Sequence, residues 1–283
     1  MRDLLAPGSM SLGAFLDAHG LDPSAVEGGR VFVDGRRATQ VERVLRAGAR
    51  VRVHDATPSP PEADIRILYE DEALLVVDKP AGVAVNVSET SARRALVERF
   101  ADRSAIAVHR LDLGTTGVLL FAKTSRAAAA LSRAFAERSV GKRYLAVVEG
   151  SEALDTVLSD PIGKDRRRPR ARAVHPAGQA AETAVKVLGS TLEAAVIEAR
   201  PRTGRTHQIR VHLSHAGRPL LGDTLYGGPA AVRLAGEIRR LPRPLLHARA
   251  LTLPKALGGH EFQAPMPEDM QAFLKAAGVD DPE

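Results

Sequence analysis

Short apolar runs bounded by polar or glycine-rich turns recur from residue 62 onward, and this pattern predicts a chain rich in strands. The expected strands are residues 65–69, 74–77, 118–122, 144–148, 184–188, 192–199 and 246–253. Residues 125–137 differ, because Ala128, Leu131 and Phe135 recur at the spacing of one helix face. Residues 206–216 also predict a helix, which ends at Gly217. Strands and helices do not alternate regularly, so we expect an α+β fold with a mixed, largely antiparallel sheet flanked by helices.

Residues 1–56 predict a small separate α/β domain. A helix is expected over 11–18, with short strands at 31–33 and 51–53 and a turn at Asp34-Gly35. A proline-rich linker at 57–62 then separates this domain from residues 63–283. The small domain is rich in arginine: Arg30, Arg36, Arg37, Arg43, Arg46, Arg50 and Arg52. Its core is too small for a substrate pocket. We therefore expect this domain either to present a basic binding face or to act only as a solubilising appendage.

Composition narrows the class of protein. A chain of 283 residues that is 44% hydrophobic can bury a full core. No stretch reaches the roughly 18 apolar residues that cross a membrane, and the amino terminus does not have the pattern of a signal peptide, so we expect a cytoplasmic protein without a membrane partner. Because there is no cysteine, disulfides, thiolate metal sites and thiol nucleophiles are excluded.

The balance of charge favours a polyanionic partner. Lysine and arginine outnumber the acids by 40 to 34, and the sequence pI is about 9.9. Residues 164–172, KDRRRPRAR, gather much of this positive charge in one segment. Such a run either contacts phosphates or is simply a solvated segment.

The clearest chemical signal is the segment HRLDLGTTG at residues 109–117, which holds one acid in a tight loop before an apolar strand. The guanidinium of Arg110 and the N–H groups of the loop favour the ionised form of Asp112. An ionised carboxylate suits a nucleophile better than a general acid. The alternative is that Asp112 only caps a turn.

A second candidate segment is the predicted strand at 141–150, where alternation places Lys142, Tyr144 and Ala146 on one face. The chain has only three tyrosines and no tryptophan, so Tyr144 is a candidate for stacking on a base. The alternative is a core tyrosine whose hydroxyl reaches the rim.

A third segment, TGRTHQIRVHL at 203–213, leads from a glycine turn into a helix and is rich in donors. Helical spacing would place Thr206 beside Arg210, so that Arg210 could point into a site where an aspartate needs a partner. Zinc binding by the nearby histidines is disfavoured, because their spacing places the rings on different helix faces. The segments at 78–82 and 222–228 predict turns that order the structure.

Taken in order, these segments resemble the RluA-type pseudouridine synthases, whose signature is H-R-L-D-x-x-T-S-G. The resemblance extends over residues 62 to about 275. Besides the signature, the matching segments within this range are 79–82, 142–150, 178–183, 204–213, 222–228 and 246–248. The first domain is similar to the small RNA-binding domain that many of these enzymes carry. Leu113 and Gly114 depart from the usual Arg-Asp, Thr116 replaces the usual serine, and Asn86 stands where histidine is common.

The resemblance implies a pseudouridine synthase fold and isomerisation of uridine to pseudouridine in ribosomal or transfer RNA, without a cofactor or metal. It implies catalytic roles for Asp112, Tyr144 and Arg210, with Asp112 attacking either the uracil or the ribose. In this reading Arg210 is the expected ion-pair partner of Asp112, and Arg205 is the next candidate. RNA contacts are expected from Arg110, Lys142, Arg205, His207 and Gln208. The oligomeric state is open, and a monomer is expected.

Two alternative functions remain from the sequence. One is an inactive RNA-binding or ribosome-assembly factor with the same fold, which the joint presence of Asp112, Tyr144 and Arg210 disfavours. The other is a glycosidase, which requires a second acid, for which Glu198 and Asp223 are the candidates.

Overall fold

The computed structural model describes residues 2–27, 31–38, 40–53, 65–85, 96–151, 155–234 and 236–279. They divide into two compact units: the described residues of 1–64 and 86–99, and the described residues of 65–85 and 100–283. The linker predicted at 57–62 and the departure at Asn86 lie outside the described residues. Of the helices described, none is long and apolar enough to cross a membrane.

The first unit contains a four-stranded antiparallel sheet in the order β1-β6-β3-β4 and a separate β2-β5 pair. Ser11 caps α1 by accepting a hydrogen bond from the Ala14 N–H, and Phe15 and Leu16 of this helix are fully buried. The elements of this unit are β1 (Arg2–Leu5), β2 (Met10–Ser11), α1 (Leu12–Ala18), α2 (Ser24–Glu27), β3 (Val31–Val33), β4 (Arg36–Arg37), β5 (Val44–Leu45), β6 (Arg50–Val53) and α3 (Leu96–Arg99).

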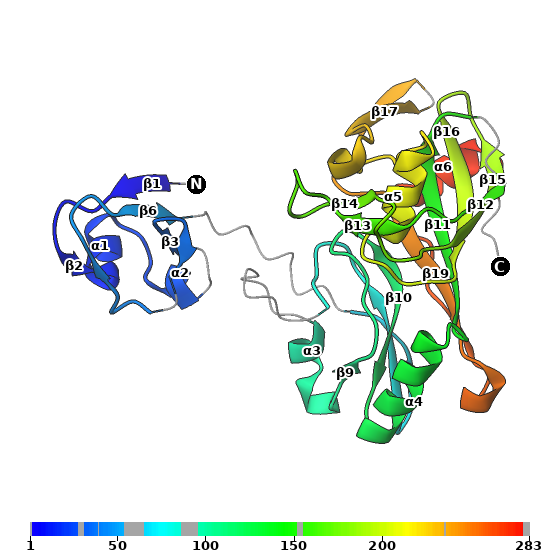
Figure 1. Ribbon diagram of the computed structural model, residues 1–283, viewed down its shortest axis with the longest axis horizontal. Coiled ribbons are helices and arrows are strands. Elements are labelled where there is room, and N and C mark those ends of the chain that lie inside the picture. Colours follow the sequence, from blue (N-terminus) through cyan, green and yellow to red (C-terminus); the bar gives the residue numbers. More distant parts are fainter. Residues whose placement is uncertain are drawn as a thin grey trace. The chain divides into compact units, whose positions relative to one another are not determined.

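The second unit is built on a ten-stranded sheet in the order β12-β15-β16-β11-β19-β10-β8-β7, with β9 paired to β10 and β20 to β19 (Figure 1). Among the described strands of this sheet, β10 and β19 run parallel and the other pairings are antiparallel. The α+β prediction of a mixed, largely antiparallel sheet is therefore confirmed.

The strands of the second unit are β7 (Ile67–Glu70), β8 (Leu74–Lys79), β9 (Ile106–Ala107), β10 (Thr116–Ala122), β11 (Gly141–Glu149), β12 (Thr156–Leu158), β13 (Ile162–Lys164), β14 (Arg172–Val174), β15 (Thr183–Ser190), β16 (Ala194–Pro201), β17 (Ala231–Leu234), β18 (Glu237–Arg240), β19 (Leu246–Thr252) and β20 (Glu261–Gln263). Its helices are α4 (Ser125–Ala136), α5 (Gln208–His215) and α6 (Glu268–Ala276), with the 3₁₀ turns η1 (Ala101–Arg103), η2 (Thr224–Tyr226) and η3 (Lys255–Leu257).

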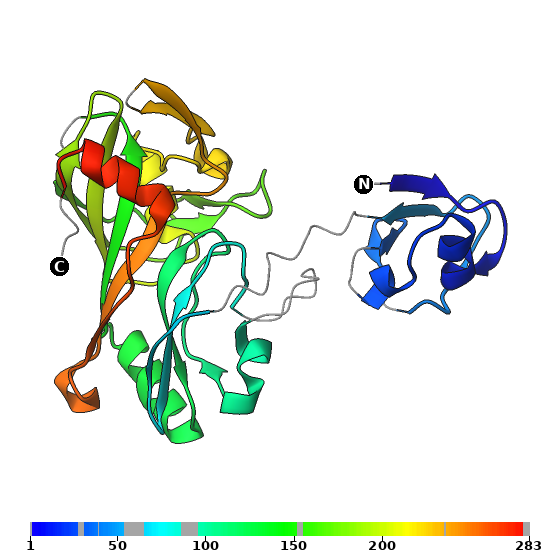
Figure 2. The same ribbon diagram turned by 180° about the vertical axis from the view of Figure 1, so that it is seen from behind.

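Strand β11 lies in the middle of the sheet and is buried on both faces. Leu145 and Val147 pack in the cluster that contains residues of α6, whereas Ala146 and Val148 pack in the cluster that contains residues of α5. Figures 1 and 2 show these two helices on opposite sides of the sheet. The pocket described below opens on the α5 side.

Gly117, the last residue of the HRLDLGTTG segment, is required by the parallel pairing of β10 with β19. It pairs with Ala248 and has a positive φ of 108°. A Cβ atom at this position would lie 2.3 Å from the Ala248 carbonyl oxygen. Only glycine therefore lets the loop of Asp112 enter the sheet at this point.

The structure differs from the predicted elements at several places. Helix α5 begins at Gln208 rather than Thr206, because His207 adopts a left-handed backbone with φ 58°. Thr206 therefore does not lie one helical turn from Arg210. Leu192 is 95% exposed in a turn before β16. The charged segment 164–172 agrees with the sequence, because residues 165–171 form the loop of the β13–β14 hairpin, between Lys164 at the end of β13 and Arg172 at the start of β14.

Because His247 is buried, we expect the folded protein to lose stability in acid. His247 lies in β19 with no exposed surface, and burial lowers its pKa to about 4, from about 6.5 in an unfolded chain. Between these values the unfolded chain binds a proton that the folded chain does not. The free energy of unfolding should therefore fall by up to about 3 kcal/mol as the pH is lowered from 6.5 to 4.

Denaturant unfolding at a series of pH values measures this effect, with His247→Gln as the comparison. In the variant, the free energy of unfolding should depend less steeply on pH. Part of the dependence should persist because of His109, whose pKa burial lowers to about 3. Equal slopes for the wild type and the variant would contradict the assignment to His247.

Candidate active site

The loop that carries Asp112 is held by two buried cations. Lys79 Nζ donates to the carbonyl oxygens of Leu113 (3.2 Å) and Thr115 (2.8 Å), and Arg243 Nη1 donates to that of Gly114 (3.2 Å). Three successive carbonyl groups of the loop are thus bound from behind. The Asp112 carbonyl closes the turn by accepting the Thr115 N–H at 3.0 Å. The backbone next to Asp112 is therefore fixed before any substrate binds.

All three N–H donors of the Lys79 ammonium group are bound to carbonyl oxygens. It has no exposed surface, and a third hydrogen bond goes to the Pro80 carbonyl at 2.9 Å. Burial lowers the pKa of Lys79 to about 7, while the nearby charge of Asp112 opposes this shift. Three carbonyl acceptors match the three donors of an ammonium group.

His109, at the start of the same loop, is fixed as a neutral ring. Its Nε2 accepts the Leu120 N–H at 2.9 Å, and the ring stacks on Phe135 of α4 with 4.8 Å between centroids. The low pKa of His109, a result of burial, keeps the ring uncharged at neutral pH. The imidazole therefore connects the loop to both β10 and α4.

Arg210 lies between two carboxylates. Its Nε and Nη2 donate to Asp223 at 2.7 and 2.8 Å, and its Nη1 donates to Asp112 Oδ2 at 3.2 Å. Asp223 is 1% exposed and Arg210 is 8% exposed. Burial alone would lower the pKa of Arg210, but Asp223 and Asp112 raise it above its usual value. Arg210 is therefore a permanent cation, oriented by Asp223 toward Asp112.

Tyr226 completes the surroundings of Asp112. The Arg210 guanidinium lies over its ring at 4.9 Å from the centroid, and its hydroxyl lies 2.7 Å from His207 Nδ1. The other ring nitrogen of His207 is 3.9 Å from Asp112 Oδ2. Both Asp223 and Tyr226 come from the glycine-bounded segment 222–228, for which the sequence predicts only an ordering role.

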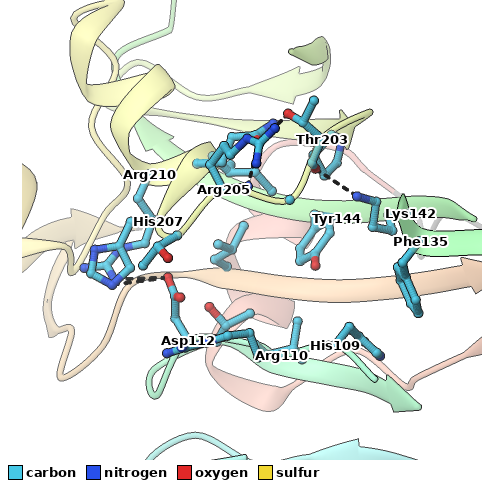
Figure 3. Close-up of a pocket in the computed structure, with 18 of the residues that line it drawn as sticks. His109, Arg110, Asp112, Phe135, Lys142, Tyr144, Thr203, Arg205, His207 and Arg210 are labelled. Carbon is cyan, nitrogen blue, oxygen red and sulfur yellow. Dashed lines mark hydrogen bonds and ion pairs between the residues drawn. The ribbon is translucent and has the colours of Figure 1, made fainter. Parts of the chain in front are cut away.

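A pocket of about 440 Å³ lies next to Asp112 and is lined from several parts of the second unit. This volume is in the range of small-ligand sites. Figure 3 shows Asp112, Arg110, Tyr144 and Lys142 around this space, with His207 and Arg210 beside the Asp112 carboxylate. A nucleotide base can therefore be enclosed within reach of an acid and an aromatic ring.

Tyr144 and Lys142 contribute different properties to the pocket. Burial and the negative charge of Asp112 both raise the pKa of Tyr144, so its phenol is protonated in the resting site. Burial lowers the pKa of Lys142 to about 8, and its Nζ donates to the Thr203 carbonyl at 2.8 Å. The sequence predicts that the two residues share a strand face, and both line the pocket.

Two other predicted residues have contacts that differ from those expected. Arg205 does not pair with Asp112, because it donates to the Ala180 carbonyl and to Gln179, both at 3.1 Å. Gln208 is 5% exposed, and its amide takes part in four hydrogen bonds, one of which its oxygen accepts from the Thr203 hydroxyl at 2.6 Å. Gln208 thus orders the segment before α5 and has no free polar atom for RNA.

The candidate second acids of a glycosidase are already paired. Glu198 accepts from Arg200 at 2.7 Å, and Asp223 is bound to Arg210. His212 lies between the Thr183 hydroxyl and the Asp160 carbonyl. Within the described residues, no cluster of three or more histidines or acids could hold a metal ion.

Asp112 thus lies beside a pocket that Tyr144 and Phe135 also line, on a mixed sheet whose parallel pair is β10 and β19. The model of the RNA pseudouridylate synthase family matches residues 73–215, and this chain belongs to that family. It is 34% identical to a ribosomal large subunit pseudouridine synthase D of Xanthomonas campestris, over 90% of this chain and 83% of the relative.

Two further comparisons agree with this assignment. A protein of the same name from Nitrosomonas europaea is 35% identical, over 87% of this chain and 76% of the relative. The solved structure of human RNA pseudouridylate synthase domain containing 4 has a TM-score of 0.60 at 26% identity, covering 77% of this chain and 95% of that one. The expected family, fold and activity on RNA are therefore confirmed.

Proposed function

We propose that this pseudouridine synthase acts on large-subunit ribosomal RNA and that Asp112 is its nucleophile. The observation that carries the proposal is the Asp112 carboxylate, held by Arg210 at 3.2 Å beside a pocket that also contains Tyr144. The names of the relatives support the choice of RNA. Transfer RNA is the alternative substrate in the same assays.

The reaction is an internal rearrangement of uridine. The bond between nitrogen 1 of uracil and carbon 1 of ribose breaks, and a bond from carbon 5 to the same ribose carbon forms. Carbon 5 loses a proton and nitrogen 1 takes one up, so substrate and product contain the same atoms. Asp112 forms a temporary ester bond to either the base or the ribose and is released at the end.

Tyr144 is proposed to stack on the uracil and to help remove the proton from carbon 5. Its pKa is raised by burial and by the Asp112 charge, so it does not act as a base in the resting site. Formation of the ester removes the charge of Asp112, and with it one of these two causes. The phenol therefore ionises more readily after the covalent step, when a base is needed.

Contacts to the RNA are proposed from Arg110, Lys142 and Arg205 around the pocket, and from the β13–β14 hairpin. Arg110 is exposed at the pocket, where it can occupy the space left in the RNA stack by an extruded uridine. Residues 1–56 are proposed to form a small RNA-binding domain. Ribosomal RNA as substrate implies the cytoplasm, and we propose a monomer.

The hairpin contact predicts a loss of affinity that depends on salt. Arg166, Arg167 and Arg170 are exposed in its turn, and changing all three to Gln should weaken RNA binding. In a filter-binding titration, the slope of log affinity against log salt should become less steep by about 0.7–0.9 for each phosphate that the variant no longer neutralises.

Removal of three charges at exposed positions outside the pocket lining serves as the control. Arg126, Lys255 and Lys275 are such residues, and their change to Gln should leave the salt slope near that of the wild type. An equal change of slope in both triple variants would contradict a specific role for the hairpin.

The proposed function is tested with RNA labelled with tritium at carbon 5 of uridine. The protein should release tritium to water from large-subunit ribosomal RNA, while the RNA keeps its mass apart from the exchanged isotope and frees no uracil. Release of tritium from transfer RNA alone would assign transfer RNA as the substrate in place of ribosomal RNA. Binding without release from any RNA would favour an assembly factor.

A further inference from the structure

The hydroxyl of Tyr226 determines which nitrogen of His207 carries a proton. It accepts a hydrogen bond from the Arg172 N–H at 2.8 Å and lies 2.7 Å from His207 Nδ1. Tyr226 is only 6% exposed, so its single O–H hydrogen requires a protein acceptor. Nδ1 of the neutral imidazole is such an acceptor. A proton on Nδ1 would instead leave the Tyr226 O–H buried without an acceptor among the described residues.

This arrangement puts the imidazole proton on Nε2, the nitrogen that faces Asp112. Burial lowers the pKa of His207, the charge of Asp112 opposes this shift and that of Arg210 adds to it, so the ring is neutral. The backbone of His207 is held in the left-handed region at φ 58°. Such strain in a non-glycine residue persists where the surrounding structure requires it.

His207 and Arg210 both face the same oxygen of Asp112. Nη1 of Arg210 is 3.2 Å and Nε2 of His207 is 3.9 Å from Oδ2. The second distance is longer than a hydrogen bond, and such contacts in catalytic sites often tighten only when the substrate is bound. Figure 3 shows the two side chains together on one side of the Asp112 carboxylate.

We infer that His207 is a positioning residue that donates from Nε2 to Asp112 Oδ2 and, together with Arg210, leaves Oδ1 as the oxygen that attacks uridine. This assigns His207 a contact with Asp112 in place of the RNA contact expected from the sequence. It also gives Tyr226 a role, since its hydroxyl selects the required tautomer. The inference rests on the proposed function of Asp112 as a nucleophile.

Two amide replacements separate a donor role from a backbone role. The side-chain nitrogen of Gln reaches the place of Nε2, whereas that of Asn, which is shorter, lies near the place of Nδ1. Asn adopts the left-handed backbone more readily than Gln. If His207 were needed only because it adopts the left-handed backbone, His207→Asn would be more active than His207→Gln. The inference predicts the reverse order.

Steady-state kinetics on the proposed RNA substrate should show this order. His207→Asn should lower kcat about 10- to 100-fold, a loss of the size seen when residues that orient metal ligands are changed. His207→Gln should retain most of the activity, and KM should change little in both variants because RNA contacts are intact. His207→Asn more active than His207→Gln would overturn the inference.

The tautomer itself is measured by ¹⁵N NMR of the full chain labelled at histidine. His207 is one of nine histidines and is assigned by the signals that His207→Gln lacks. The wild type should show an unprotonated Nδ1 and a protonated Nε2, and Tyr226→Phe should shift the signals toward a mixture of tautomers. A protonated Nδ1 in the wild type would overturn the inference.

The two measurements also separate this inference from the proposed function. If the wild type isomerises no uridine, the proposed function fails, and the tautomer measurement still decides whether Tyr226 directs the His207 proton toward Asp112. If the wild type is active and the tautomer is reversed, only the inference about His207 fails.

Discussion

Asp112→Asn is expected to abolish formation of pseudouridine, with a loss of at least about 10³-fold in kcat, while RNA binding is retained. The amide has nearly the same volume as the carboxyl group but cannot attack carbon. Phosphate contacts are supplied by basic side chains elsewhere, so the affinity for RNA should stay the same or rise slightly as a negative charge is removed. Tritium release and a binding titration on one preparation measure both effects.

Asp102→Asn provides a matched control, because Asp102 is exposed and does not line the pocket. This variant should release tritium at the wild-type rate. Turnover by Asp112→Asn, or loss of RNA binding together with activity, would contradict the role given to Asp112.

Asp223→Ala is expected to lower the free energy of unfolding by about 3–5 kcal/mol, because it removes the bidentate partner of a buried arginine. Arg210 would keep only the single contact to Asp112 Oδ2. Its guanidinium would no longer be oriented, so turnover should fall as well. Denaturant unfolding and tritium release measure the two effects.

The double variant Arg210→Met, Asp223→Leu separates stability from chemistry. Replacing a whole buried ion pair by apolar side chains of similar volume often restores stability, so this protein should unfold at nearly the wild-type denaturant concentration. It should still be inactive, because Asp112 no longer has its cation. Wild-type stability of Asp223→Ala, or activity of the double variant, would contradict this account of Arg210.

The chemistry of the site is readable from the sequence where it depends on local pattern. The tight loop around Asp112 and the strand alternation at Lys142 and Tyr144 each follow from residues close together in the chain. The pairing of Arg210 with Asp112 is predicted from the family resemblance, whereas Thr206, placed beside Arg210 by the predicted helix, lies before that helix. A left-handed residue such as His207 has no periodic signal, so the predicted start of α5 is wrong by two residues.

The residues that hold the site are not readable in the same way. Lys79 and Arg243 bind backbone carbonyl groups, which leave no mark in the sequence. Asp223 and Tyr226 act only after the fold brings segment 222–228 beside α5. An acid within the glycine-bounded segment 222–228 is the signal that the sequence offers for Asp223.

Helix α6 is absent from the predicted elements although the sequence contains a signal for it. Its residues Met270, Phe273 and Leu274 recur at helical spacing and are buried. The N-cap of α6 is Pro267, which provides no side-chain acceptor for a helix start. Periodicity alone is enough to find this helix.

The most direct test maps pseudouridine in ribosomal and transfer RNA from cells that lack the gene, complemented with either the wild type or Asp112→Asn. The account predicts that one or more defined sites in large-subunit ribosomal RNA lose pseudouridine and that only the wild type restores them. An unchanged map, or restoration by Asp112→Asn, would contradict it.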